Sequence, residues 1–188
     1  TTGLEKKDWI GTSGKITLFF KNPVKWKYTD EKNNYDTSFR FIFSNQSLKE
    51  FEKNSQDSKR GLKDYIPGYI QIYPEGAAQR KMGYIEEFDK VILFTKNFSF
   101  ENKGEDLNEI KNNIISRFLK FIENPEDLID SKFMTPKDLN EIFLFPKGNI
   151  DHLSLSTNQN FNKRSLSSAP NDKFYRYSDY NNIYYCGA

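Results

Sequence analysis

The sequence predicts a soluble α+β protein built on an antiparallel sheet or flattened β-sandwich of about six to eight strands, with one long and one or two short helices. Two observations predict this fold class. Apolar residues alternate with period 2 in several short segments, and one longer segment in the second half carries apolar residues at three- and four-residue steps. Strands and helices do not alternate along the chain as they do in a doubly wound parallel sheet.

The length and composition indicate one folded domain over residues 1–188. A chain of 188 residues falls within the usual size of a single domain, and no Pro/Gly/Ser-rich linker divides it. Aromatic residues make up 16% of the chain and the formal net charge is only +2, so the composition is not that of a disordered protein. The balance of 28 basic and 26 acidic residues also argues against a dedicated duplex-DNA binder.

The first third of the chain is predicted to form a β-hairpin or meander. Apolar and polar residues alternate over 15–20, 24–28 and 37–43, and the charged, Asn-rich run 30–34 is typical of a turn. On the second strand Trp26 and Tyr28 share one face, which we expect to be buried, and lysines occupy the other. On the third strand the expected core residues are Phe39, Phe41 and Phe43.

A short helix and two further strands are predicted in the middle of the chain. Ser47 and Glu50 are three residues apart, the spacing of a capping box at a helix start. A strand over Tyr69–Tyr73 is expected to end at Pro74, and Glu75–Gly83 is expected to form a long turn or a brief helical turn. The apolar run that follows predicts a strand over Phe88–Thr95.

The second half is predicted to contain two helices and an extended tail. Apolar spacing predicts the longer helix over Glu105–Asn124. Thr135 as cap and Pro136 as first helical residue predict a second helix that ends before Pro146. Short strands are then expected around Leu153–Leu155, Lys173–Tyr177 and Ile183–Cys186.

Residue counts exclude several kinds of site. Cys186 is the one cysteine and His152 the one histidine, so an intramolecular disulfide and a four-ligand Cys/His zinc site are impossible. We therefore predict no metal and no cofactor. The longest apolar runs are a few residues, whereas a membrane-spanning helix needs about 20, so no transmembrane segment is expected.

Catalytic patterns are weak, and the sequence favours a protein that is not an enzyme without deciding the matter. His152 and Ser154 are about 6.6 Å apart along a strand. A nucleophile and its base must approach to about 2.6–3.2 Å, so the two do not form a catalytic pair by themselves. The carboxylates Glu86, Glu87 and Asp89 are close in sequence and are the remaining candidates for hydrolytic acid–base chemistry.

Two groups of residues are candidates for binding. Arg80 and Lys81 lie in a short basic segment between two glycines, which would suit an anion or an acidic partner residue. The tail is crowded with tyrosines beside an arginine, and Tyr and Arg are enriched where proteins contact each other. The tail candidates are Tyr175, Arg176, Tyr177, Tyr180, Tyr184 and Tyr185.

Three function classes follow from these patterns. The first is a non-catalytic binding or accessory protein that acts through protein–protein contact, either an envelope or secreted component or an inhibitor or immunity-type protein. The second is a hydrolase or toxin-like enzyme that uses carboxylates. The third, which the sequence disfavours, is a single-stranded nucleic-acid binder that uses the Lys-Trp-Lys-Tyr segment at 25–28. A protein partner is expected, and the oligomeric state is left open.

Codon usage and the start of the chain bear on its origin. Heavy use of Lys, Asn, Ile, Phe and Tyr indicates an AT-rich genome, which we expect to be bacterial. The chain opens at Thr1 without a methionine, from which we expect that a leader or another segment has been removed. An extracytoplasmic location (periplasmic, envelope-anchored or secreted) is therefore favoured over a cytoplasmic one, and a lipoprotein is one form of it.

Overall fold

A computed structural model describes most of the chain between residues 13 and 150. The described residues are 13–28, 36–43, 47–50, 52–53, 69–95, 98, 100 and 104–150. They belong to two compact units, one formed by Thr12–Thr135 and the other by Thr1–Gly11 with Pro136–Ala188. The three strands expected beyond residue 150 lie outside the described residues. The single domain over 1–188 stays a prediction.

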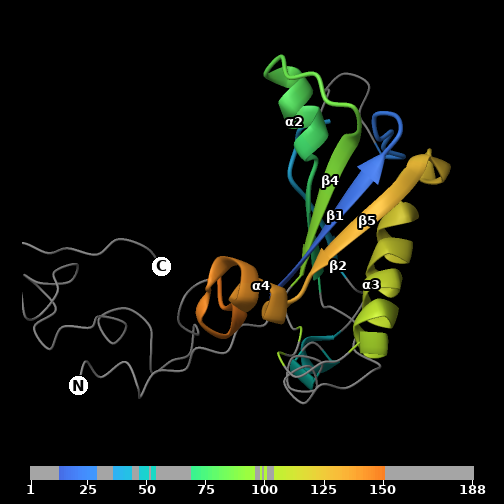
Figure 1. Cartoon of the computed structure of the whole chain (residues 1–188). Helices are drawn as coiled ribbons and strands as arrows, with labels where there is room; N and C mark the ends of the chain where they lie inside the picture. Colours follow the sequence, from blue (N-terminus) through green and yellow to red (C-terminus); the bar gives the residue numbers. More distant parts are fainter. Residues whose placement is uncertain are drawn as a thin grey trace, which may run out of the picture. The chain divides into compact units, whose positions relative to one another are not determined.

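An antiparallel five-stranded sheet forms the centre of the Thr12–Thr135 unit (Figure 1). The strand order is β2-β3-β4-β1-β5, and every neighbouring pair is antiparallel. The α+β class and the antiparallel sheet are confirmed, but the described residues form five strands, fewer than the six to eight predicted. The strands are β1 (Gly14–Phe20), β2 (Arg40–Phe43), β3 (Tyr69–Tyr73), β4 (Asp89–Thr95) and β5 (Leu128–Met134).

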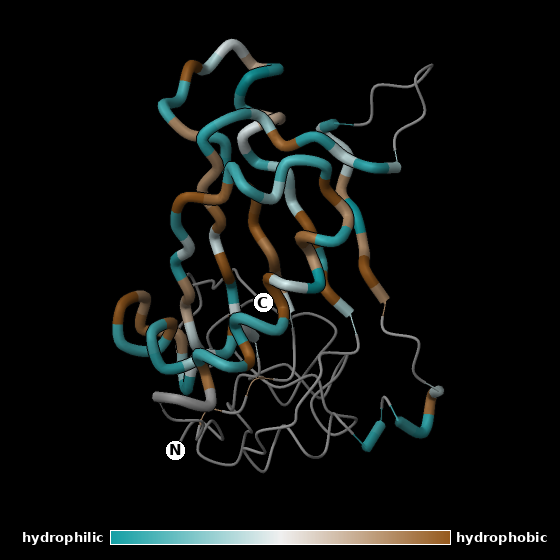
Figure 2. Tube along the Cα trace, turned by 90° about the vertical axis from the view of Figure 1, so that its right-hand side faces the viewer, coloured by the Kyte–Doolittle hydropathy of each residue, from teal (hydrophilic) through white to brown (hydrophobic). Residues whose placement is uncertain are grey.

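Strands β1 and β4 pair with each other inside the sheet, and both show the predicted period-2 pattern. Ile16 pairs with Leu93 and Leu18 pairs with Val91, and all four side chains are fully buried. Residues between them are half-buried, so each strand has one face in the core and one that is partly open. Figure 2 shows this alternation of hydrophobic and hydrophilic residues along the strands.

Helix α3 (Gly104–Leu119) lies along one face of the sheet (Figure 1). Its apolar side chains Ile110, Ile114 and Phe118 are fully buried in the core that also contains the inward residues of the strands. The predicted helix over 105–124 was too long at its C-terminal end. The chain turns after Leu119, and Ile122 instead forms an antiparallel bridge with Trp26.

The first of the shorter helices begins at the capping signal that the sequence predicted. Residues 48–50 and 52–53 are helical, and the predicted capping box is confirmed. Glu50 accepts a hydrogen bond from the Ser47 N–H at 2.7 Å, and the Glu50 N–H donates to Ser47 Oγ at 3.3 Å. Glu75–Lys81 forms helix α2, and Pro136–Phe143 forms helix α4 of the other unit. Short 3₁₀ turns cover Pro125–Asp127 and Pro146–Gly148.

The buried and exposed faces of strand β2 are the reverse of those predicted. Ile42 pairs with Ile70 and is buried, so Arg40 and Ile42 face the core. Phe41 and Phe43 point to the other face. Alternation shows that a strand has two faces, and the more aromatic face was expected to be buried. Pairing with β3 reverses this, because the core face of β3 is Ile70 and Ile72. The expected core residues that are exposed instead are Phe39, Phe41 and Phe43.

Candidate functional site

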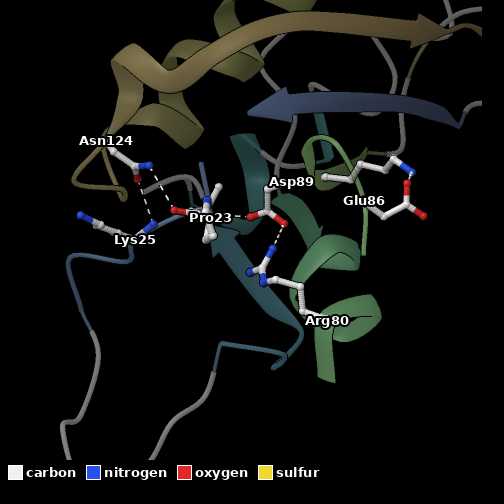
Figure 3. Close-up of polar contacts among 8 residues, drawn as sticks. Pro23, Lys25, Arg80, Glu86, Asp89 and Asn124 are labelled. Carbon is white, nitrogen blue, oxygen red and sulfur yellow. Dashed lines mark hydrogen bonds and ion pairs between the residues drawn. The ribbon is translucent and has the colours of Figure 1, made fainter. Parts of the chain in front are cut away.

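The acidic cluster at the start of β4 contains a buried structural carboxylate. The Asp89 side chain is only 3% exposed, and its Oδ1 forms an ion pair with Arg80 of α2. Its Oδ2 accepts a hydrogen bond from the Val24 N–H at 2.8 Å (Figure 3). A Cβ on Gly76 would overlap Asp89 Oδ1, so α2 packs directly against this carboxylate. Asp89 therefore joins β4 to α2 and to the segment that follows β1.

The other candidate catalytic carboxylates lie in a different environment. Glu86 forms an exposed ion pair with Lys90 at 3.1 Å, and Glu87 is exposed. Figure 3 shows the Glu86–Lys90 pair beside the separate Arg80–Asp89 pair. The three carboxylates therefore have different surroundings. In the part of the chain that the structure describes, they do not converge on one site where a substrate could react.

The predicted basic site lies at the end of α2. Arg80 is 40% exposed, but one of its guanidinium nitrogens is engaged by Asp89. Lys81 is the last residue of the helix and is exposed, and Gly83 follows with a φ of +87° that favours glycine. Binding of an anion by Arg80 and Lys81 stays a prediction. The tail candidates Tyr175, Arg176, Tyr177, Tyr180, Tyr184 and Tyr185 lie outside the described residues.

Asn124 holds the segment between β1 and Trp26 in place. Its Oδ1 accepts a hydrogen bond from the Lys25 N–H at 2.9 Å, and its Nδ2 donates to the Pro23 carbonyl at 3.2 Å (Figure 3). Nδ2 also donates to Asp127 Oδ2 at 2.7 Å, and Asn22 Nδ2 donates to Asp127 Oδ1 at 3.1 Å. With the bond from Val24 to Asp89, these contacts fix the path of residues 22–25 and so determine where Trp26 lies.

These hydrogen bonds predict a low pKa for Asp127. The bond from Asn124 is the largest cause, and desolvation opposes it, while the Asn22 bond and the charges of Lys21 and Lys25 lower the pKa further. A carboxylate whose pKa is lower in the folded state stabilises the fold above the pKa of the unfolded state. That stability is lost as the pH falls through the folded pKa. In Asn124→Ala we expect the pKa of Asp127 to rise toward its ordinary value.

A ¹³C NMR titration of the Asp127 carboxyl carbon measures this change. Asn22→Ala removes a weaker contribution and should give a smaller rise than Asn124→Ala. An unchanged pKa of Asp127 in folded Asn124→Ala would contradict the assigned cause.

Trp26 and Tyr28 do not share a buried face. Trp26 is 6% exposed, as expected, and its ring meets Phe118 edge to face at 6.0 Å. Tyr28 is 79% exposed, which contradicts the prediction, and its ring lies 6.3 Å from that of Phe121. The alternation fails here because Trp26 forms a single bridge to Ile122 and does not continue as a strand. Since Trp26 belongs to the core, its ring is not available as an open platform for base stacking.

Arg40 is a polar member of the core-facing side of β2. Its guanidinium carbon lies 3.9 Å from the centroid of the Trp26 ring, and its Nη1 donates to the Ser38 carbonyl at 2.6 Å. Burial lowers the pKa of Arg40, and the charge of Asp36 opposes that shift. A partly desolvated cation therefore lies over an indole at the end of an edge strand.

A pocket of about 300 Å³ lies beside these residues. Its walls are aromatic and aliphatic side chains together with the Arg40 guanidinium. We name it the edge pocket because Arg40, Phe41 and Ile42 of the edge strand β2 contribute to it. No sequence pattern predicted this pocket, although Trp26 and Tyr28 of the Lys-Trp-Lys-Tyr segment line it. The lining residues are Trp26, Tyr28, Arg40, Phe41, Ile42, Ile72 and Phe121.

Five aromatic rings from β2, β3 and the residue before β2 form a continuous cluster, in which Tyr69 is half-buried and the other four residues are exposed. The Phe39 ring lies 4.6 Å from that of Phe41 and 4.7 Å from that of Tyr73, and the Phe41 and Phe43 rings stack at 5.5 Å. Tyr69 joins the cluster through a 6.1 Å contact with Phe41. Phe43 is the most open member, at 68% exposure. We call this cluster the aromatic face; its members are Phe39, Phe41, Phe43, Tyr69 and Tyr73.

Comparison with protein-family models, with curated proteins and with solved structures gives no match for this chain. Within the described ranges no helix is both long and apolar enough to cross a membrane. No group of three or more His, Cys, Asp or Glu side chains in that part of the chain is arranged to hold a metal ion. The bacterial origin and the extracytoplasmic location stay predictions.

Proposed function

We propose that this chain is a non-catalytic binding protein that acts through protein–protein contact. The observation that supports this most directly is the aromatic face. Its five rings contact one another, yet Phe39, Phe41, Phe43 and Tyr73 keep 42–68% of their surface exposed. Contiguous exposed apolar surface of this kind is typical of interaction sites, because monomeric proteins rarely expose apolar clusters, whereas scattered exposed apolar residues are common.

The surroundings of the aromatic face favour a protein as the partner. Strand register places Gln71 opposite Phe41, and Ile92 opposite Tyr73, so uncharged residues adjoin the rings. A nucleic acid would need cations beside the rings to neutralise phosphates. On the same side of the sheet Lys15, Lys90 and Lys132 belong to β1, β4 and β5, away from β2. Aromatic rings with polar neighbours are instead the usual composition of protein interfaces.

The proposed mechanism is occlusion or scaffolding of a partner by this surface. An envelope or secreted component and an inhibitor or immunity-type protein both act in this way, so both remain within the proposal. Neither needs a catalytic group, and the buried Asp89 and the exposed Glu86–Lys90 pair are accounted for by structural contacts.

Phe43→Ser provides the test, with Ile129→Ser as its matched control. Both side chains are exposed and apolar, but Ile129 belongs to β5, at the opposite edge of the sheet from β2. Affinity capture from an extract of the native cells is expected to recover one stoichiometric protein with the wild type and with Ile129→Ser. Phe43→Ser should weaken that complex by about tenfold, because truncation of an interface aromatic costs more than 1 kcal/mol when the ring is a binding hot spot.

Three outcomes would contradict the proposal. The first is a captured complex that Phe43→Ser and Ile129→Ser weaken equally, and the second is the absence of any stoichiometric partner. The third is salt-sensitive binding of a fluorescent single-stranded oligonucleotide that is lost in Phe43→Ser, which would assign the aromatic face to nucleic acid.

A further inference from the structure

The two edges of the sheet differ in how well they resist pairing with another strand. Natural proteins protect edge strands with bulges, charged residues or prolines. At β5 the register with β1 shifts between Phe19 and Phe20, and the exposed charges of Asp130 and Lys132 lie along the strand. Strand β2 has only four residues, which itself limits pairing, but it reads Arg-Phe-Ile-Phe and its pairing with β3 is regular. Its one charged side chain is Arg40, which turns to the Trp26 ring.

The edge pocket and the aromatic face meet at this less protected edge. Arg40 and Ile42 point to the α3 side of the sheet and line the pocket, while Phe43 points to the open side. Phe41 belongs to the aromatic face and also lines the pocket, so the two surfaces are continuous around β2. Side chains of a strand added beside β2 would alternate between these two surfaces, because successive residues of a strand point to opposite faces.

We propose that the partner contributes an extended segment that pairs with the outer edge of β2, with alternate side chains in the edge pocket and on the aromatic face. The inference rests on the proposed function and specifies the form of the contact. Main-chain hydrogen bonds to β2 supply affinity, and the alternate pockets supply selectivity, as in other cases of strand addition. A pocket of about 300 Å³ is large enough for one bulky apolar side chain.

The charge around the pocket favours an acidic residue in the bound segment. Arg40 lies inside the pocket, and Lys27 lies next to it, since Lys27 donates through its N–H to the Phe121 carbonyl at 3.1 Å and through Nζ to the Lys120 carbonyl at 3.0 Å. Asp36 is the acidic group whose charge acts on Arg40. An added carboxylate near the guanidinium would form a charge-assisted contact in a partly desolvated site.

The same charges argue for a different protein over a second copy of this chain. Pairing of β2 with the β2 of a second copy would bring the sequence Arg-Phe-Ile-Phe against itself. That arrangement adds a second arginine to the edge, and the paired β2 strand itself contains no carboxylate. A segment of apolar residues with an acidic neighbour complements both the rings and the cations.

The experiment uses the full chain and the partner captured with it. Hydrogen exchange followed by mass spectrometry should show slower exchange of the β2 amides when the partner is bound, because strand pairing protects edge amides. Tyr28→Ser and Arg40→Gln should each weaken the complex by about tenfold, and Arg40→Lys should weaken it less because the charge remains. Tyr84→Ser is the matched control: Tyr84 is also an exposed tyrosine but does not line the pocket, and it should change affinity less than twofold.

The outcomes separate this inference from the proposed function. Suppose that Phe43→Ser abolishes binding of the partner. If the bound partner then leaves hydrogen exchange of the β2 amides unchanged, or if Tyr84→Ser weakens the complex as much as Tyr28→Ser does, strand addition is wrong and the proposed function still holds. If light scattering shows a concentration-dependent dimer that Phe43→Ser dissociates, the edge of β2 binds a second copy of this chain and the inference is wrong. If no partner depends on Phe43, both proposals fail. Circular dichroism of each variant verifies that it is folded.

Discussion

Phe118→Ala is expected to lower the free energy of unfolding by about 3–5 kcal/mol, the usual cost of deleting a buried aromatic ring. Phe118 is fully buried on α3, and its ring meets the edge of Phe20 at 6.3 Å and of Trp26 at 6.0 Å. Strand β1, which carries Phe20, is paired on both sides, by β4 and β5. The walls of the resulting cavity therefore cannot close, so the lost contacts are not replaced.

Urea denaturation measures this effect as a lower midpoint with an unchanged slope. Phe118→Leu is the control, because it keeps most of the volume and should cost less than about 1.5 kcal/mol. A loss below about 1 kcal/mol for Phe118→Ala would show that neighbouring side chains fill the cavity, and it would contradict this prediction. In a Trp9→Phe background Trp26 is the one remaining tryptophan. Its fluorescence should change in Phe118→Ala, because the indole ring loses its edge-to-face contact with Phe118.

Asp89→Ala is expected to destabilise the fold by about 3 kcal/mol, the lower end of the range for breaking a buried ion pair. The Asp89 side chain is 3% exposed, whereas Arg80 is 40% exposed and keeps part of its hydration, which limits the cost. The substitution also leaves the Val24 N–H without its carboxylate acceptor. Because Val24 precedes Trp26, the change should also loosen the edge pocket.

Glu86→Ala provides a matched control for Asp89→Ala. Both substitutions remove a carboxylate from an ion pair close to the start of β4, but the Glu86–Lys90 pair is exposed. Exposed pairs contribute only about 0.2–1 kcal/mol, so thermal or urea denaturation should separate the two variants clearly. Equal losses would mean that burial of Asp89 does not determine its contribution. A double-mutant cycle with Arg80→Ala would then measure how much of the effect belongs to the pair.

Phe118 and Asp89 connect the stability of the chain to the proposed binding surface. Trp26 packs between Phe118 and Arg40, and the path of the chain before it is held by Asp89 and Asn124. The edge pocket therefore adjoins buried residues with defined contacts, although Tyr28 itself is exposed. A surface of this kind needs little reordering when a partner binds, which lowers the entropic cost of association.

Local patterns in the sequence were sufficient where one face of an element is strongly apolar. Alternation over 15–20 predicted β1, and the apolar run before Thr95 predicted β4. Helical spacing predicted the buried residues Ile110, Ile114 and Phe118 of α3. The capping box at Ser47 was also recognisable, because the cap and its reciprocal hydrogen bond lie three residues apart.

Strand β5 was missed because its sequence has no period-2 pattern. It reads Leu-Ile-Asp-Ser-Lys-Phe-Met, with apolar residues in adjacent pairs at both ends. It is a strand because β1 offers an edge for it, with Ile16 opposite Phe133. Pairing between strands far apart in the chain cannot be recognised from a short segment of sequence.

By itself the sequence determined the α+β class, the central strands, the long helix and the residue counts that exclude a disulfide or a Cys/His zinc site. Only the tertiary structure decided which face of β2 is buried. Alternation is symmetric between the two faces of a strand, and the choice comes from the register with β3, which places Ile42 beside Ile70. That one pairing turns three phenylalanines outward and places Arg40 over Trp26, and together these form the surface on which the proposed function depends.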